Sequence, residues 1–167
     1  MRAAVLVLAL AALAATAARA GEPVGCDKFK FSVAQDIAAL RAPGLTALSS
    51  GAEIGAAPFS AAVRLRPAAD AGLPQPPERA AKDGTFAGYL SLKSLPPGLY
   101  SVSLSAAAWL DLVHEGRYLK PEAFSGVQGC EGIRKVVRFR IDAAPLVVQV
   151  SGVASESIAI AILPAAD

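Results

Sequence analysis

Side chains that could bind a ligand or take part in a reaction lie closest together in this sequence around position 110. Trp109 and His114 are the single tryptophan and the single histidine of the chain, and Asp111 lies between them. An exposed tryptophan beside an aspartate is a typical stacking and hydrogen-bonding pair in sugar- and peptide-binding proteins. Because strand ends and turns present recognition residues on a rigid scaffold, we expect any ligand or partner to contact Trp109, Asp111 and His114.

Arg134 and Lys135 are the cations that we expect to lie next to this surface. Side chains of these types hold carboxylate or phosphate groups, so the pair is a candidate anion contact. A structural role remains open for each candidate residue. Trp109 is equally suited to a core, Asp111 to the cap of a local turn, and an arginine-rich strand face to blunting a sheet edge with charge.

A hydrolase-type site near Asp111 and His114 is the alternative chemistry. The chain has no G-x-S-x-G nucleophile motif to accompany the histidine. A mononuclear iron dioxygenase needs two histidines and a carboxylate, and a catalytic zinc needs a comparable ligand set. One histidine cannot supply either set, so we predict neither a metal nor another cofactor.

Residues 1–20 have the pattern of a signal peptide. A single arginine precedes an unbroken apolar run, which closes on Ala18-Arg19-Ala20, a small-residue cleavage pattern. The protein is therefore expected in the periplasm or outside the cell. Removing Arg2 and Arg19 leaves 16 − 2 = 14 basic against 14 acidic residues. Such a neutral chain has no general attraction to nucleic acid, and no later apolar run is long enough to span a membrane.

Cys26 and Cys130 are the only two cysteines of the chain. In an oxidising compartment an even pair of cysteines is typical of a disulfide. A loop of roughly 100 residues closed in this way stabilises the fold by about 4 to 5 kcal/mol in the chain-entropy model. Two free buried thiols are the alternative.

The elements that must position these residues are mainly β-strands. We expect strands over 29–33, 62–66, 85–92, 99–105, 109–113, 133–141, 146–150 and 158–163, and apolar and polar side chains alternate over 29–33, 62–66 and 99–105. Residues 34–41 predict a two-turn helix, 42–60 a loop or irregular edge, and 68–84 a proline-rich surface connection. We therefore expect one all-β domain over 21–167, an antiparallel, jelly-roll-like β-sandwich with one short N-terminal helix.

Two sets of segments resemble known families. The runs 97–104, 138–141 and 146–152 resemble strands of the pre-peptidase C-terminal type of β-sandwich. Residues 26–29, 108–111 and 129–135 resemble a family of small exported proteobacterial proteins of no established function. The resemblance implies a sandwich and brings no catalytic residue. Proteins of this family can carry a homogentisate dioxygenase label, which the single histidine contradicts.

Taken together, the sequence favours an exported, non-catalytic β-sandwich that binds a small ligand or serves as an accessory to another exported component. A purely structural envelope protein is a further alternative. The enzyme interpretation would require a polar pocket that converges on Asp111 and His114.

Mass spectrometry of the non-reduced, exported protein tests the processing and the disulfide together. We expect the mature chain to begin at Gly21 and to contain a peptide pair linked through Cys26 and Cys130. Alkylation of both thiols without a reductant would contradict the disulfide.

Overall fold

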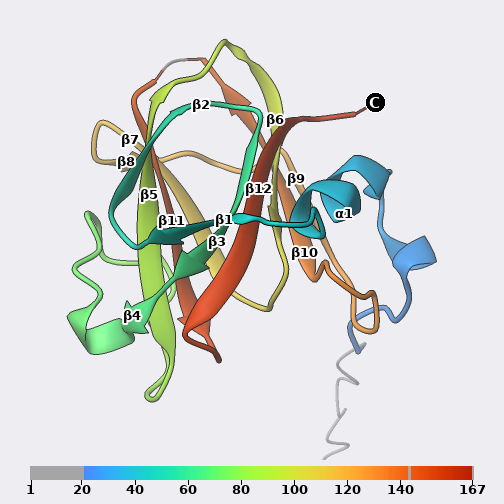
Figure 1. The fold of residues 1–167 in the computed structure, drawn as a ribbon, viewed down its shortest axis with the longest axis horizontal. Helices are drawn as coiled ribbons and strands as arrows, with labels where there is room; N and C mark the ends of the chain where they lie inside the picture. Colours follow the sequence, from blue (N-terminus) through green and yellow to red (C-terminus); the bar gives the residue numbers. More distant parts are fainter. Residues whose placement is uncertain (1–20, 143, 167) are drawn as a thin grey trace, which may run out of the picture.

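Two β-sheets packed face to face form the fold, which the computed structural model describes for residues 21–142 and 144–166 (Figure 1). The first sheet has the order β1 (Thr46–Ser49), β3 (Phe59–Arg64), β12 (Ser157–Pro164), β6 (Gly98–Leu104), β10 (Lys135–Ile141) and β9 (Ala123–Gly126). The second has the order β2 (Ala52–Ala56), β5 (Phe86–Ser94), β11 (Leu146–Val153), β7 (Trp109–His114) and β8 (Arg117–Tyr118), and β4 (Arg66–Pro67) pairs with β5. This confirms the all-β sandwich. The predicted signal peptide lies outside the described residues.

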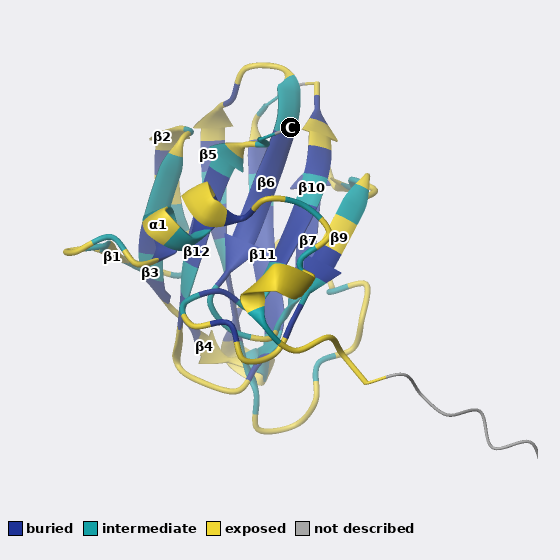
Figure 2. Ribbon diagram, turned by 90° about the vertical axis from the view of Figure 1, so that its right-hand side faces the viewer, coloured by how far each residue is buried: buried dark blue, intermediate teal, exposed yellow. Residues whose placement is uncertain are grey.

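The two-residue alternation of the strands builds the core between the sheets. On β10, Val137, Phe139 and Ile141 point inward as predicted, and on β11 Val148 and Val150 do the same. Complete burial of a side chain of this size contributes about 1.5 to 3 kcal/mol. Figure 2 shows the resulting bands of buried residues along the central strands.

The segment 42–60, expected to be irregular, instead contributes two strands and the start of a third. β1 pairs in parallel with β3, and β2 pairs in parallel with β5, so both sheets are mixed. The remaining strand pairs are antiparallel. A segment rich in Ala, Gly and Ser has a low intrinsic β-propensity. Its conformation here is decided by pairing with strands of the two sheets.

The N-terminal helix α1 (Ala34–Leu40) forms as predicted and covers the outer face of the first sheet (Figure 2). Its Leu40, with Val33 before it, packs on Val136 and Ala161 of the sheet. The strand expected over 29–33 does not form. Phe29 and Phe31 of this segment pack beside the same cluster, so their alternation reflects the partial burial of a bent segment without a strand partner.

A disulfide joins the short 3-10 helix η1 (Cys26–Lys28) to the loop before β10. The bond links Cys26 to Cys130, the pair that the sequence predicted, and their Cα atoms lie 4.8 Å apart. Next to it, Val24 forms a parallel bridge with Gln128. The N-terminal segment is therefore held against the edge of the first sheet.

The proline-rich connection lies across the outer face of the second sheet. After η2 (Ala68–Asp70), residues 71–84, here called the strap, run over β11 and β7. The Gln149 side chain donates to the Gln75 carbonyl at 3.1 Å, and the Tyr118 hydroxyl donates to the Pro76 carbonyl. The strap thus shields the polar outer face of this sheet from solvent.

A buried hydrogen bond between Ser103 of β6 and Asp36 of α1 tests how the helix is held. The Ser103 hydroxyl donates to the Asp36 carboxyl group, and both residues are buried. Ser103→Ala leaves that carboxyl without its partner, so we expect a loss of about 1 to 3 kcal/mol in the free energy of unfolding, measured with urea. Ser94→Ala at an exposed strand end is the control, with an expected change below about 0.5 kcal/mol. Equal unfolding midpoints for the two variants would contradict this role.

Candidate functional site: a cationic groove

A cavity of about 610 Å³ opens where the edges of both sheets meet the N-terminal segment and the strap. We call it the cationic groove. The residues lining it come from six parts of the chain, within 22–30, 79–82, 107–109, 124–126, 134–135 and 151–152. Its size lies in the range of cavities that receive small ligands.

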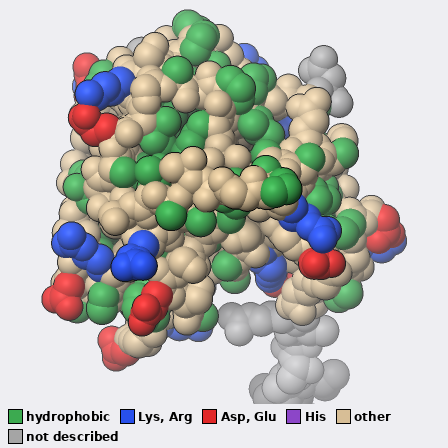
Figure 3. Space-filling model, in the orientation of Figure 1, with side chains coloured by type: hydrophobic (Ala, Val, Ile, Leu, Met, Phe, Trp, Pro, Cys, Tyr) green, Lys and Arg blue, Asp and Glu red, His purple; other side chains and the backbone are tan. Residues whose placement is uncertain are grey.

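Positive charge dominates the lining of the groove. Of its charged side chains, six are cationic and one is acidic, and these are Lys28, Lys30, Arg79, Lys82, Arg134, Lys135 and Glu22. On the face shown in Figure 3, most Lys and Arg side chains lie close to Asp or Glu side chains. In the groove, Lys28 pairs with Asp27 and Arg134 with Glu22, and elsewhere on the protein Lys93 pairs with Glu53 and Arg140 with Glu122. The groove therefore concentrates positive charge on a chain whose predicted mature form is neutral.

Two cations lie over the ring of Trp109, which lines the groove. The Lys135 ammonium lies 5.3 Å and the Arg79 guanidinium 5.8 Å from the ring centroid, distances of cation–π contacts. The indole N–H donates to the Asp111 carboxylate at 2.7 Å, which fixes the orientation of the ring. Trp109 is half-buried, so it belongs neither wholly to the core nor wholly to the surface.

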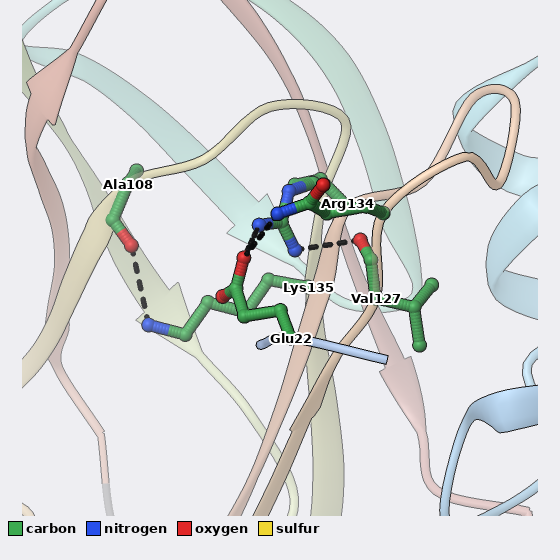
Figure 4. A network of polar contacts seen from close by, with 6 residues as sticks. Glu22, Ala108, Val127, Arg134 and Lys135 are labelled. Carbon is green, nitrogen blue, oxygen red and sulfur yellow. Dashed lines mark hydrogen bonds and ion pairs between the residues drawn. The ribbon is translucent and has the colours of Figure 1, made fainter. Parts of the chain in front are cut away.

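Arg134 holds the carboxylate of Glu22 at the edge of the first sheet. One of its guanidinium nitrogens donates to the Val127 carbonyl at 2.6 Å, and the other pairs with Glu22 (Figure 4). The side chain of Gln128 donates to the same carboxylate oxygen at 3.2 Å. Hydrogen bonds from Gln128 and Arg134 hold the pKa of Glu22 below its ordinary value, so this carboxylate is ionised at neutral pH.

Lys135 presents a desolvated ammonium group close to Arg134. Its Nζ atom donates to the Ala108 carbonyl at 3.1 Å (Figure 4). Burial, followed by repulsion from Arg79, lowers the pKa of Lys135 from its ordinary value. A bound anion would relieve both effects, because it would offset the neighbouring positive charge and stabilise the protonated amine.

Asp111 lies beneath the groove instead of on its surface. It is only 4% exposed, and its carboxylate accepts hydrogen bonds from Trp109, from the Glu78 backbone N–H at 3.3 Å and from Gln149 at 3.2 Å. Its role in the structure is thus to hold the strap and the indole ring together. Beside it, the Ser151 hydroxyl is buried without a hydrogen-bond partner among the described residues, although Ser151 lines the groove.

The structure does not bring His114 into this site. Asp111 and His114 are three residues apart on β7, which is about 10 Å along a strand, and alternation places them on opposite faces. The His114 ring nitrogen Nδ1 instead lies 2.9 Å from the Pro145 carbonyl. Of the five residues expected on one surface, Trp109, Arg134 and Lys135 line the groove, Asp111 supports it and His114 lies elsewhere.

Several groove residues were not recognised from the sequence. Arg79 lies in the segment predicted as a surface connection, Lys30 in a segment predicted as a strand, and none of Glu22, Lys28, Lys30 and Arg79 was expected to contribute to a site. The exposed Phe124 is part of a strand that the sequence did not predict. They lie in separate parts of the chain and share no sequence pattern that indicates that they meet.

No family model, curated protein or solved structure matches this chain. Among residues 21–142 and 144–166, no cluster of three or more His, Cys, Asp or Glu side chains is arranged to hold a metal ion. Over the same ranges, no helix is both long and apolar enough to cross a membrane.

Substitution of Asp111 tests its supporting role. Asp111→Ala leaves the Trp109 indole, the Glu78 N–H and the Gln149 amide without their acceptor, so we expect a loss of about 1 to 3 kcal/mol in unfolding free energy. Asp70→Ala, which removes an exposed carboxylate, is the matched control and should change stability by less than about 0.5 kcal/mol. Urea unfolding measures both, and an Asp111→Ala protein as stable as this control would contradict the role.

Proposed function

We propose that this chain is an exported, non-catalytic binding protein that receives an anionic ligand in the cationic groove. The observation that carries the proposal is the lining of the groove, with six cations, one carboxylate and two aromatic rings, Trp109 and Phe124. Gathering like charges in a partly desolvated cavity is unfavourable for folding alone. A ligand of opposite charge offsets that cost, which is the usual reason for such a cluster in a binding site.

The absence of a shared catalytic geometry around Asp111 and His114 supports binding over hydrolysis. These two side chains lie on opposite faces of β7, and the Asp111 oxygens already accept three hydrogen bonds. A triad requires the base and its orienting carboxylate in direct contact. A purely structural envelope protein is the other alternative, and it gives no reason for an open, charged cavity.

Two features support export to the periplasm or the medium. The first is the signal-peptide pattern over residues 1–20, and the second is the disulfide between Cys26 and Cys130, a bond that persists in oxidising compartments. The resemblance to small exported proteobacterial proteins agrees with this placement. In that setting the ligand is either a small anion or an anionic group of another exported component.

Fluorescence of Trp109, the single tryptophan, provides a direct binding measurement. We expect a short sulfated dextran to change this emission and neutral dextran to leave it unchanged. Added salt should weaken the binding, because it screens charges in an open site. Lys135→Gln should reduce affinity about tenfold, since it removes a charged, desolvated donor.

Lys120→Gln makes the same change of charge at an exposed position outside the groove and is the control. Its affinity should stay within about twofold of the unmodified protein. Equal losses in the two variants would show a general charge effect and would contradict a site at the groove.

A further inference from the structure

We propose that Glu22 occupies the place of a ligand carboxylate, and that the ligand is a short oligosaccharide containing uronic acids. This rests on the groove being the binding site. In Figure 4 the Glu22 carboxylate lies against Arg134, and the Lys135 ammonium group lies beside Ala108; all four residues line the groove. The chain itself therefore demonstrates that a carboxylate fits this position.

The Arg134 position is built before any ligand arrives. The hydrogen bond from its guanidinium to the Val127 carbonyl fixes the orientation of the Arg134 side chain. Gln128 adds a neutral donor to the Glu22 oxygen that Arg134 also contacts. A fixed guanidinium with a second donor beside it is a specific carboxylate site, because little side-chain entropy is lost when the acid binds.

Replacing the Glu22 carboxylate by a carboxylate of the ligand costs little free energy. The Glu22 side chain remains 54% exposed, and exposed ion pairs contribute only about 0 to 1 kcal/mol. The segment that carries it is anchored only from Pro23 onward, by the hydrogen bonds that Pro23 and Gly25 form with Gln128. An external carboxylate can therefore replace Glu22 without disturbing the disulfide or the sheet edge.

The groove has a second cationic position, formed by Lys135 and Arg79. Lys135 and Arg79 lie beside the Trp109 ring, and Glu22 is the single carboxylate that lines the cavity with them. Burial and the proximity of Arg79 both disfavour the charged form of Lys135. Two separate cationic positions therefore favour a ligand with repeated acidic groups over one with a single charge.

The aromatic surfaces favour a sugar as the scaffold between those acidic groups. Phe124 is 58% exposed and lines the groove, with the Lys30 ammonium 5.2 Å from its ring centroid. Sugar rings present C–H faces that pack on aromatic rings, while their carboxylates reach neighbouring cations. A cavity of about 610 Å³ limits the bound part to a few sugar units.

Titration of the exported protein with trigalacturonate, followed by Trp109 fluorescence and calorimetry, tests the assignment. We expect Glu22→Gln to bind trigalacturonate about two- to fivefold more tightly than the unmodified protein, because no internal carboxylate competes. Glu53→Gln, which removes an exposed carboxylate paired with Lys93 outside the groove, should leave the affinity unchanged. Equal affinities for Glu22→Gln and Glu53→Gln would overturn the role of Glu22.

Three further probes test the ligand class. Neutral trigalactose should not bind, and triglutamate and tripolyphosphate should bind more weakly than trigalacturonate. Phe124→Ala should weaken trigalacturonate binding at least about threefold and leave tripolyphosphate binding unchanged, because phosphate does not pack on the ring. Tighter binding of triglutamate or tripolyphosphate would overturn the saccharide. If no anion, including sulfated dextran, binds any variant, the binding function itself fails.

Discussion

The buried Asp111 carboxylate is the interaction on which the groove depends. It accepts hydrogen bonds from the Trp109 ring, from the strap at Glu78 and from Gln149 on the neighbouring strand. These bonds fix the indole and the strap relative to the second sheet, and the strap then carries Arg79 to the ring. Leaving a buried donor without an acceptor costs far more free energy than losing an exposed hydrogen bond. The Asp111 side chain therefore keeps this wall of the groove in place.

The opposite wall is held by a different kind of constraint. The disulfide between Cys26 and Cys130 and the bridge between Val24 and Gln128 hold the N-terminal segment at the edge of the first sheet. Lys28 and Lys30 of the N-terminal segment and Arg79 of the strap line the same groove. Because both segments are held in place, the repulsion between these cations does not separate them. Under the proposed function, such preorganisation would reduce the ordering cost of binding a charged ligand.

The strands could be predicted wherever every second side chain is apolar and points into the core between the two sheets. The pattern of Val137, Phe139 and Ile141 marks β10, and the helix α1 follows from apolar spacing before Pro43 and Gly44. Prediction failed over 42–60, where β1 and β2 depend on parallel partners distant in sequence. It also failed over 29–33, where alternation arises from packing on a sheet face without any strand pairing.

By itself, the sequence determined the cysteine pairing and the lack of a second histidine, because residue type alone limits that chemistry, and it singled out Trp109, Arg134 and Lys135 as candidate residues. Only the tertiary structure decided which of these side chains meet. It buried Asp111, placed His114 on the opposite face of its strand, and brought Arg79 from the strap to the groove. Contacts of this kind depend on how the sheets and the strap pack, and no local spacing in the chain encodes that arrangement.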